Sequence, residues 1–337
     1  MSRKNFNIKI IAEIAQGFEG NLDQSKLLVK AAAKSGADSV KFQMVFADEL
    51  ATKDYQYFKL FHSLEMDKNK WEYLKKYSDK LGIDFLVDVF GTKSLNIADD
   101  IGIKTIKIHG TDITNIGLLE AISYSSIKNV ILGVGGSLWS EISVAINILQ
   151  KKSLTILCGF QGYPTRAEDN QINRMRVIKK KVSEIHSNFK MGFADHPNEE
   201  EFFSTFGLTA IGAGATVIEK HLTIAKVMEL EDFESALNPD EFSKFVSQIR
   251  IGEKALGSLV DSEDFDMSSA EGEYREKVRR DVVAFKNIKK GERLSSKNIA
   301  LKRTSEKNTI KQIELVYGKT VNTSIKKNKP ILKSNLE

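Results

Sequence analysis

The chain has 337 residues, of which 41% are hydrophobic and 28% charged, with four prolines and one cysteine. This length fits two domains or one large barrel with a small addition, and the composition is typical of globular proteins. The single cysteine, Cys158, excludes a disulfide framework and a cysteine-based zinc module, which suits a reducing cytoplasm.

Charge and hydropathy exclude two classes of partner. No apolar stretch approaches the roughly 20 residues that a membrane-spanning helix needs, and Lys9 and Glu13 interrupt the apolar run near the N-terminus. We therefore expect neither a signal peptide nor a membrane partner. Basic residues concentrate after Arg275, but without interleaved aromatic residues, so we expect a solvated surface and no nucleic-acid partner.

Short apolar runs bounded by Gly, Asp or Asn alternate with longer amphipathic segments over the first 255 residues or so. Such runs are typical of buried parallel strands. The predicted strands are Ile8–Ile14, Ser39–Gln43, Ile83–Asp88, Ile103–Ile108, Asn129–Val134, Leu154–Gly159, Lys190–Asp195 and Thr216–His221. The segments with helical spacing between or after them are 23–35, 67–81, 137–150, 198–208 and 239–256.

Eight strands alternating with helices predict a (β/α)8 barrel. An open, doubly wound sheet is the alternative, but no GxGxxG motif follows the first strand. We expect the barrel domain to span residues 1–260 and an acidic, small-residue-rich linker to span 261–277. Residues 278–337 contain short β-like runs separated by turns, which predict a small β-rich domain; an extension that caps the barrel is the alternative.

The reactive groups of barrel enzymes lie at the C-terminal ends of the strands. His196 and His221 follow or end the seventh and eighth predicted strands, which are neighbours, so both imidazoles can reach one ion. Two neutral nitrogens completed by water or substrate oxygens suit Mn, Fe, Co or Zn better than Mg or Ca. The alternative is that both are hydrogen-bonded core residues.

Lys41 and Lys107 lie at the ends of the second and fourth predicted strands. Buried lysines need a neutralising partner, and either an anionic substrate or an ion pair with Glu13, Glu19 or Asp88 can supply it. Three carboxylates are candidate acid–base groups, namely Glu19, Glu219 and Asp232.

Taken together, these motifs resemble the sialic acid synthase family, whose members condense phosphoenolpyruvate with an N-acylated amino sugar. The resemblance covers essentially the whole chain, and DFESALNP begins eleven residues after His221. The segments that carry it are IAEIAQGFEGNL, GADSVKFQ, IKTIKI, GYPT, GFADHP, VIEKHLT, DFESALNP and the C-terminal DVVAFKNIKKGERLSSKNIALKR, which looks like an antifreeze-type (SAF) domain.

The resemblance implies a role for each candidate residue. His196 and His221 would bind a divalent metal, most often Mn. Glu19, Glu219 and Asp232 would serve the sugar and the proton transfers. Lys41 and Lys107 would hold phosphoenolpyruvate. The remaining substrate-binding residues would be Gln43, Gln161, Tyr163 and Arg303, the last reaching from the SAF domain into the barrel of a partner subunit in a homodimer.

Several phosphate-loop positions depart from the usual family pattern. The chain reads GFEG at 17–20 for NHEG, KIHG at 107–110 for KIGS, and GVG at 133–135 for STG. The asparagine usual before YPT is offset to Gln161, Ala194 replaces the serine of SDH, and Asp88 stands where a threonine is frequent. Either the phosphate is held by other groups or the substrate differs. The alternative functions are a barrel lyase or aldolase using a Lys41 or Lys107 Schiff base, and a non-catalytic sugar-binding protein.

Overall fold

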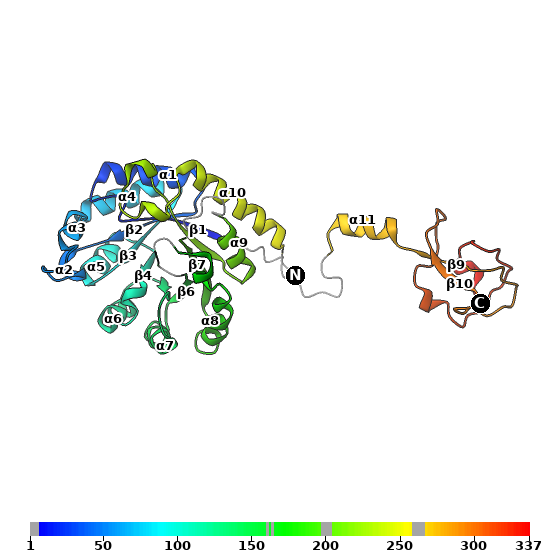
Figure 1. Cartoon of the computed structure of the whole chain (residues 1–337). Helices are drawn as coiled ribbons and strands as arrows, with labels where there is room; N and C mark the ends of the chain where they lie inside the picture. The colour runs from blue at the N-terminus through cyan, green and yellow to red at the C-terminus, as the bar shows by residue number, and fades with distance from the viewer. Residues whose placement is uncertain (1–6, 160–161, 163–164, 197–203, 258–266) are drawn as a thin grey trace. The chain divides into compact units, whose positions relative to one another are not determined.

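The computed structural model describes residues 7–159, 162, 165–196, 204–257 and 267–337. The chain divides into two compact units, Met1–Ser258 and Leu259–Glu337, each of which is described by itself (Figure 1). Of the helices in the described ranges, none combines the length and the apolar character that crossing a bilayer requires.

The first unit is a closed barrel in which eight parallel strands pair in sequence order and β8 returns to β1 (Figure 1). The predicted (β/α)8 barrel is confirmed, and the open sheet is excluded. The strands are β1 (Lys9–Ala15), β2 (Ser39–Met44), β3 (Asp84–Val89), β4 (Thr105–Ile108), β5 (Asn129–Gly133), β6 (Ser153–Cys158), β7 (Phe189–Asp195) and β8 (Val217–His221).

Ten α-helices in the described part of this unit follow or connect the strands. The predicted helical segments that lie wholly within the described ranges each contain a helix, whereas α2, α3, α5, α6 and α8 are additional. In 198–208 the described helix begins only at Thr205. The helices are α1 (Leu22–Lys34), α2 (Ala47–Leu50), α3 (Phe58–Ser63), α4 (Lys68–Leu81), α5 (Thr92–Asp100), α6 (Ile116–Tyr124), α7 (Trp139–Ile148), α8 (Arg174–Ser183), α9 (Thr205–Gly212) and α10 (Pro239–Leu256).

Local signals explain where these helices begin and end. Asp67 caps α4 by accepting a hydrogen bond from Lys70 N at 2.9 Å, and Gly82 ends the helix with φ of 71°. Helix α10 begins with Pro239 after Asn238, whose backbone N–H donates to Glu241 in a capping box.

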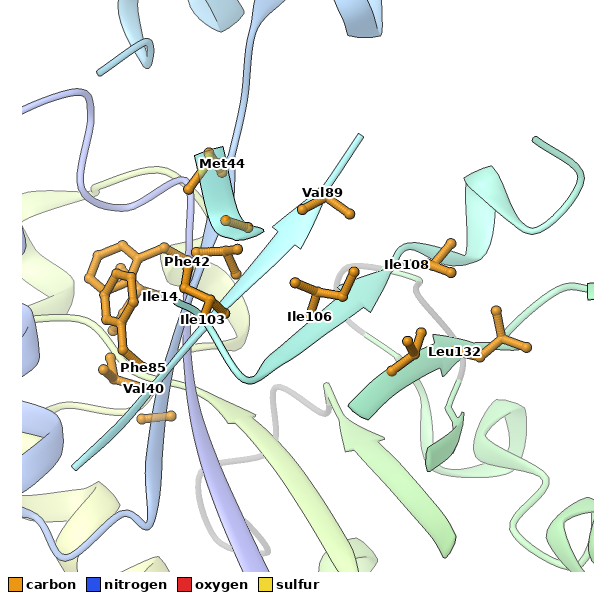
Figure 2. Packing of buried hydrophobic residues seen from close by; sticks show 14 of the residues in the cluster. Ile14, Val40, Phe42, Met44, Phe85, Val89, Ile103, Ile106, Ile108 and Leu132 are labelled. Carbon is orange, nitrogen blue, oxygen red and sulfur yellow. The ribbon is translucent and has the colours of Figure 1, made fainter. Parts of the chain in front are cut away.

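Apolar side chains on the outer face of the barrel pack against the helices and form the main core. Figure 2 shows this packing along β2, where Val40, Phe42 and Met44 belong to the buried cluster together with Phe85 of β3. The Phe42 and Phe85 rings lie 5.5 Å apart. Because strand side chains alternate between faces, burying these residues outside the barrel turns Lys41 and Gln43 into its interior.

The second unit contains helix α11 (Ser269–Val278) and an antiparallel pair, β9 (Asp281–Ala284) and β10 (Ile299–Lys302). A small separate core, which includes Val282, Leu294 and Val321, holds it together. The small β-rich domain is confirmed. The segment 261–277 predicted as a linker contains most of α11, which begins because Ser268 and Glu271 form a capping box.

Candidate active site

A layer of charged residues lies inside the barrel toward the C-terminal ends of its strands. Beneath it the interior is apolar, with Ile11, Leu86, Ile131, Leu157, Ala194 and Val217 in one cluster. Two positions further along their strands, Ile11 is followed by Glu13, Leu86 by Asp88 and Val217 by Glu219. Residues two apart share a face of a strand, so these carboxylates point into the barrel, where Lys41 and Lys107 meet them. We call these five residues the charged layer.

Lys41 of β2 is enclosed by the three carboxylates of the charged layer. Its ammonium group forms ion pairs with Glu13 and with Asp88, whose Oδ1 lies 2.6 Å from Nζ. Glu219 Oε2 lies 3.6 Å away. Lys41 and Asp88 are both 0% exposed, so all of these charges lie outside the reach of solvent.

Lys107 of β4 pairs with the same three carboxylates. Its Nζ lies 2.8 Å from Glu219 Oε1, 3.4 Å from Asp88 Oδ2 and 3.9 Å from Glu13 Oε2. Asp88 therefore bridges the two lysines, one with each carboxylate oxygen. In this arrangement the lysines form the ion pairs that the sequence left as an alternative, with Glu219 as an additional partner.

Burial and mutual attraction shift the pKa values within the charged layer. Burial lowers the pKa of Lys41 to about 8. Burial also opposes the charge of Lys107, but Asp88 and Glu219 outweigh it and hold its pKa above the ordinary value. For Glu219, burial is outweighed by the two lysines, which lower its pKa to about 2. With three carboxyl groups and two lysines, the layer has a formal charge of −1.

His196 and His221 converge at the ends of β7 and β8. Their ring centroids lie 5.2 Å apart, and each residue is 3% exposed. Burial lowers the pKa of His196 to about 3 and that of His221 well below its ordinary value. Both imidazoles are therefore neutral at pH 7, which is the form that ligates metals.

This pair fits a divalent metal ion as two neutral nitrogen donors beside a layer with excess negative charge. Within the described ranges, no group of three or more His, Cys, Asp or Glu side chains is arranged to hold an ion. The remaining coordination positions would therefore fall to water or substrate oxygens, as in catalytic sites that keep open positions. Such a donor set suits Mn, Fe, Co or Zn better than Ca.

The residues that immediately precede the two histidines in the chain form a buried ion pair. Asp195 precedes His196 and Lys220 precedes His221, and Asp195 Oδ1 lies 3.2 Å from Lys220 Nζ. Neither side chain is more than 1% exposed. Because Asp195 and Lys220 are also paired in the β7–β8 register, the ion pair ties the two strand ends that carry the histidines.

We expect Lys220→Met to lower the free energy of unfolding by about 3–5 kcal/mol, because it leaves the Asp195 carboxylate buried without its cation. The double variant Lys220→Met/Asp195→Asn should recover most of this lost stability. Urea unfolding of the single and the double variant measures the free energy of unfolding of each. Lys68→Met is the matched control, since Lys68 pairs with Asp100 at 2.7 Å on the surface, and its loss should be below about 1 kcal/mol. Equal losses of unfolding free energy in Lys220→Met and Lys68→Met would contradict the larger contribution that we expect from the buried pair.

Two hydrogen bonds connect Gln43 of β2 to Asp232 through Gln16. Gln43, two residues beyond Lys41, accepts a hydrogen bond from Gln16 Nε2 at 2.9 Å, and Gln16 N donates to Asp232 Oδ2 at 3.2 Å. Burial raises the pKa of Asp232 to about 6. Asp232 can therefore take up or release a proton near neutral pH.

The structure does not bring every predicted site residue to this centre. Glu19 is exposed on the loop after β1, where Gln24 Nε2 lies 3.5 Å from its carboxylate. Gln161 and Tyr163 lie outside the described residues. Arg303 belongs to the second unit, is exposed, and donates from Nε to Val278 O at 3.1 Å. The roles expected for these four residues stay predictions.

Three residues of the site were not among the predicted site residues. Glu13 and Asp88 complete the charged layer, and Gln16 links Gln43 to Asp232. Glu13 and Asp88 could have been included from their positions in strand register with Lys41 and Lys107, because charged residues on a barrel's inner face must pair. No pattern in the sequence singles out Gln16.

Comparisons with known proteins identify the family of the chain. A model of the NeuB family matches residues 28–261, and a model of the SAF domain matches residues 279–337. The chain is 35% identical to an uncharacterised protein of Methanocaldococcus jannaschii, over 93% of this chain and 89% of that protein. It is 31% identical to the N,N'-diacetyllegionaminic acid synthase of Campylobacter jejuni, over 96% of this chain and 98% of that protein. The solved structure of the N-acetylneuraminic acid synthetase of Leptospira borgpetersenii aligns with a TM-score of 0.72 at 30% identity, over 82% of this chain and 93% of that one.

Proposed function

The chain belongs to the NeuB family, and we propose that it condenses phosphoenolpyruvate with an N-acylated amino sugar, giving a sialic-acid-type nonulosonate and inorganic phosphate. The observation that carries this proposal is the convergence of two buried lysines, Glu219 and two neutral histidines at the C-terminal end of one barrel. The ammonium groups of the two lysines can form charge-assisted hydrogen bonds to an anionic substrate.

Lys41 and Lys107 hold the carboxylate and phosphate groups of phosphoenolpyruvate in the proposed reaction. To do so they exchange part of their pairing with Asp88 for the substrate anion. The enol carbon attacks the aldehyde carbon of the open-chain sugar and forms the new C–C bond, while the aldehyde oxygen takes up a proton. Positive charge develops on the carbon that bears phosphate, and the role of the Glu219 carboxylate in this reaction is to stabilise that charge.

Water then adds to this carbon and loses one proton. The C–O bond to phosphate breaks, the remaining hydroxyl proton passes to the departing phosphate, and the keto group of the product is left. Asp232, with its pKa near 6, suits one of these proton transfers; Glu19 is the proposed partner of the sugar. A divalent cation, for which we propose Mn, would be held by His196 and His221 and would supply Lewis-acid polarisation of the aldehyde.

Release of inorganic phosphate tests the proposal. Purified protein with Mn, phosphoenolpyruvate and a panel of N-acylated hexosamines should release one phosphate per sugar consumed, and none when the sugar is omitted. No release with any sugar of the panel, while phosphoenolpyruvate still binds, would overturn the proposed reaction.

A Schiff-base lyase or aldolase is the second candidate, and the lowered pKa of Lys41 favours it. A lysine whose pKa is about 8 has an appreciable neutral fraction near pH 7.5, and the neutral amine is the nucleophile. Borohydride added with pyruvate would trap a covalent adduct on Lys41. An adduct found by peptide mass spectrometry would favour this reaction over the condensation, and its absence would remove the candidate.

We further propose a homodimer in which Arg303 of one subunit serves the barrel of its partner. Arg303→Ala should then lower kcat/KM about 10-fold or more, the loss expected for one charge-assisted contact to an anion. Arg293→Ala is the matched control, because Arg293 is exposed in the same domain and also donates from Nε to a backbone carbonyl. Arg293→Ala should leave kcat/KM unchanged.

Co-expression of Arg303→Ala with His196→Ala tests whether the arginine acts across subunits. Each hybrid dimer would contain one intact site, so random pairing should restore about a quarter of wild-type activity. If the co-expressed protein is no more active than the separate variants, Arg303 does not act in the barrel of the partner subunit.

A further inference from the structure

A groove of about 300 Å³ lies between helices α8 and α9, which follow β6 and β7 outside the barrel (Figure 1). Its described lining includes residues 170–173, Arg176 of α8, and Thr205, Phe206 and Thr209 of α9. This volume lies at the lower end of the range of small-molecule sites. We call this feature the α8–α9 groove. Its described lining shares no residue with the charged layer or the histidine pair.

Arg176 carries the one charge in the described lining of the groove. Its side chain is exposed, and it forms no ion pair within the ranges that the structure describes. The acidic residues that precede the lining segment, Glu168 and Asp169, pair instead with Arg166, at 3.3 Å and 3.0 Å. The Arg176 guanidinium group can therefore hold the carboxylate of a ligand through two parallel hydrogen bonds.

Neutral hydrogen-bonding groups adjoin Arg176. The side-chain NH2 group of Asn170 donates to the Arg166 carbonyl oxygen at 3.0 Å, and that of Gln171 donates to the Glu168 carbonyl oxygen at 2.6 Å. Their amide oxygens can accept hydrogen bonds from a ligand, and the exposed Asn173 side chain can both donate and accept. Such a lining suits a ligand with several hydroxyl groups.

Phe206 and Ile172 supply the apolar part of the groove. Both are partly buried and pack against the main core of the barrel, which holds them in place. An aromatic ring held in this way offers a surface for a methyl group or for C–H groups. A carboxylate, hydroxyl groups and an acyl methyl group occur together in N-acylated sugar acids, which is the class of product that the proposed reaction forms.

Asn170 and Gln171 form a wall that the groove shares with a small inner cavity of about 30 Å³. Residues 134–136 after β5 and Cys158 at the end of β6 line the same cavity. By the resemblance to the family, residues 133–135 belong to a phosphate loop. A ligand that favours one position of this wall can therefore favour one position of the loops on its other side.

We propose that the α8–α9 groove binds an N-acylated sugar acid of the product class, and that this binding slows the reaction in the barrel. The inference rests on the proposed function, because that reaction produces such an acid. It assigns Arg176 to the carboxylate, residues 170–173 to the hydroxyl groups and Phe206 to the acyl methyl group.

Calorimetric titration of the full chain with N-acetylneuraminate tests the binding. Arg176→Gln should weaken it about 10-fold or more, the loss expected for one charge-assisted contact. Phe206→Ala should weaken it about threefold or more, because the acyl methyl group loses its apolar contact.

Lys181→Gln is the matched control for this titration. Lys181 also belongs to α8, but its Nζ lies 5.0 Å from the centre of the Trp139 ring of α7, on another side of the helix. Lys181→Gln should leave the Kd unchanged. An unchanged Kd in both Arg176→Gln and Phe206→Ala, or no binding by the wild type at millimolar concentration, would overturn the inference.

The phosphate-release assay tests the effect on the reaction. Added N-acetylneuraminate should lower kcat and leave KM for phosphoenolpyruvate unchanged, because the described lining of the groove lies apart from the charged layer. Arg176→Gln should raise the inhibition constant about 10-fold. Inhibition that competes with phosphoenolpyruvate, or an inhibition constant that Arg176→Gln does not change, would show that the acid acts inside the barrel and would contradict the proposed regulation.

Hydrogen–deuterium exchange tests the connection through the shared wall. A saturating concentration of the acid should slow exchange in peptides that contain residues 134–136 and 167–173, in the wild type but not in Arg176→Gln. Slower exchange in 167–173 alone would contradict transmission to the loop after β5.

The titration also distinguishes failure of this inference from failure of the proposed function, since it needs no turnover. Binding of the acid that is lost in Arg176→Gln, without phosphate release from any sugar, would support the groove and overturn only the proposed reaction. Phosphate release together with binding that Arg176→Gln and Phe206→Ala leave unchanged would overturn only the groove.

Discussion

His196→Ala and His221→Ala should each lower metal-dependent turnover by about 1,000-fold, equivalent to about 4 kcal/mol of transition-state stabilisation. Each substitution removes one of the two neutral nitrogens that converge at the ends of β7 and β8. Phosphate release measures the activity, and titration with Mn measures the affinity for the metal. We expect both to fall together while the melting temperature changes little.

His186 provides a control matched for burial. It is 6% exposed, and its Nε2 lies 3.0 Å from the Asn188 carbonyl oxygen, away from the strand ends that carry the pair. His186→Ala should lower the melting temperature and leave Mn binding intact. Full activity in either His196→Ala or His221→Ala would refute the assigned metal site.

Lys107→Met should lower kcat/KM for phosphoenolpyruvate about 100-fold, because it removes a charge-assisted contact to the substrate. It should also lower the free energy of unfolding by about 3–5 kcal/mol, since three buried carboxylates then face one lysine. The double variant Lys107→Met/Asp88→Asn has the same net charge as the wild-type layer. It should regain most of the stability but none of the activity.

Asp88→Asn alone gives the opposite result for substrate affinity. The Asp88 carboxylate bridges both lysines and competes with any anion that approaches them. Removing its charge should lower KM for phosphoenolpyruvate and Kd for inorganic phosphate, each about 10-fold. Weaker phosphate binding in Asp88→Asn, or recovered activity in the double variant, would show that the lysines serve the fold and not the substrate.

Much of the fold follows from local patterns. All eight strands were predicted close to their observed bounds, because buried parallel strands are short apolar runs ended by Gly, Asp or Asn. The resemblance to the sialic acid synthase family is confirmed by the match to the NeuB family and by its named relatives. Helix α8 (Arg174–Ser183) was not predicted, since six of its ten residues are charged or hydroxylated and only Met175, Ile178 and Val182 are buried.

Most residues of the site could be predicted from the sequence, but the contacts between them could not. Lys41, Lys107, Glu219, His196 and His221 were singled out, because the C-terminal ends of barrel strands carry the chemistry. The sharing of Asp88 between both lysines joins residues 41, 88 and 107, which no local pattern relates. The link from Gln43 through Gln16 to Asp232 spans 216 positions between its last two members.

By itself the sequence determined the alternation of strands and helices, the inward face of each strand and the types of residue at the strand ends. These features depend on the periods of two and 3.6 residues, which can be read along one segment. Only the tertiary structure decided that three carboxylates enclose two lysines, because closing the barrel brings β1, β2, β3, β4 and β8 around one interior. Charges that share so small an apolar space must pair with one another, and which of them pair depends on distances that no single segment contains.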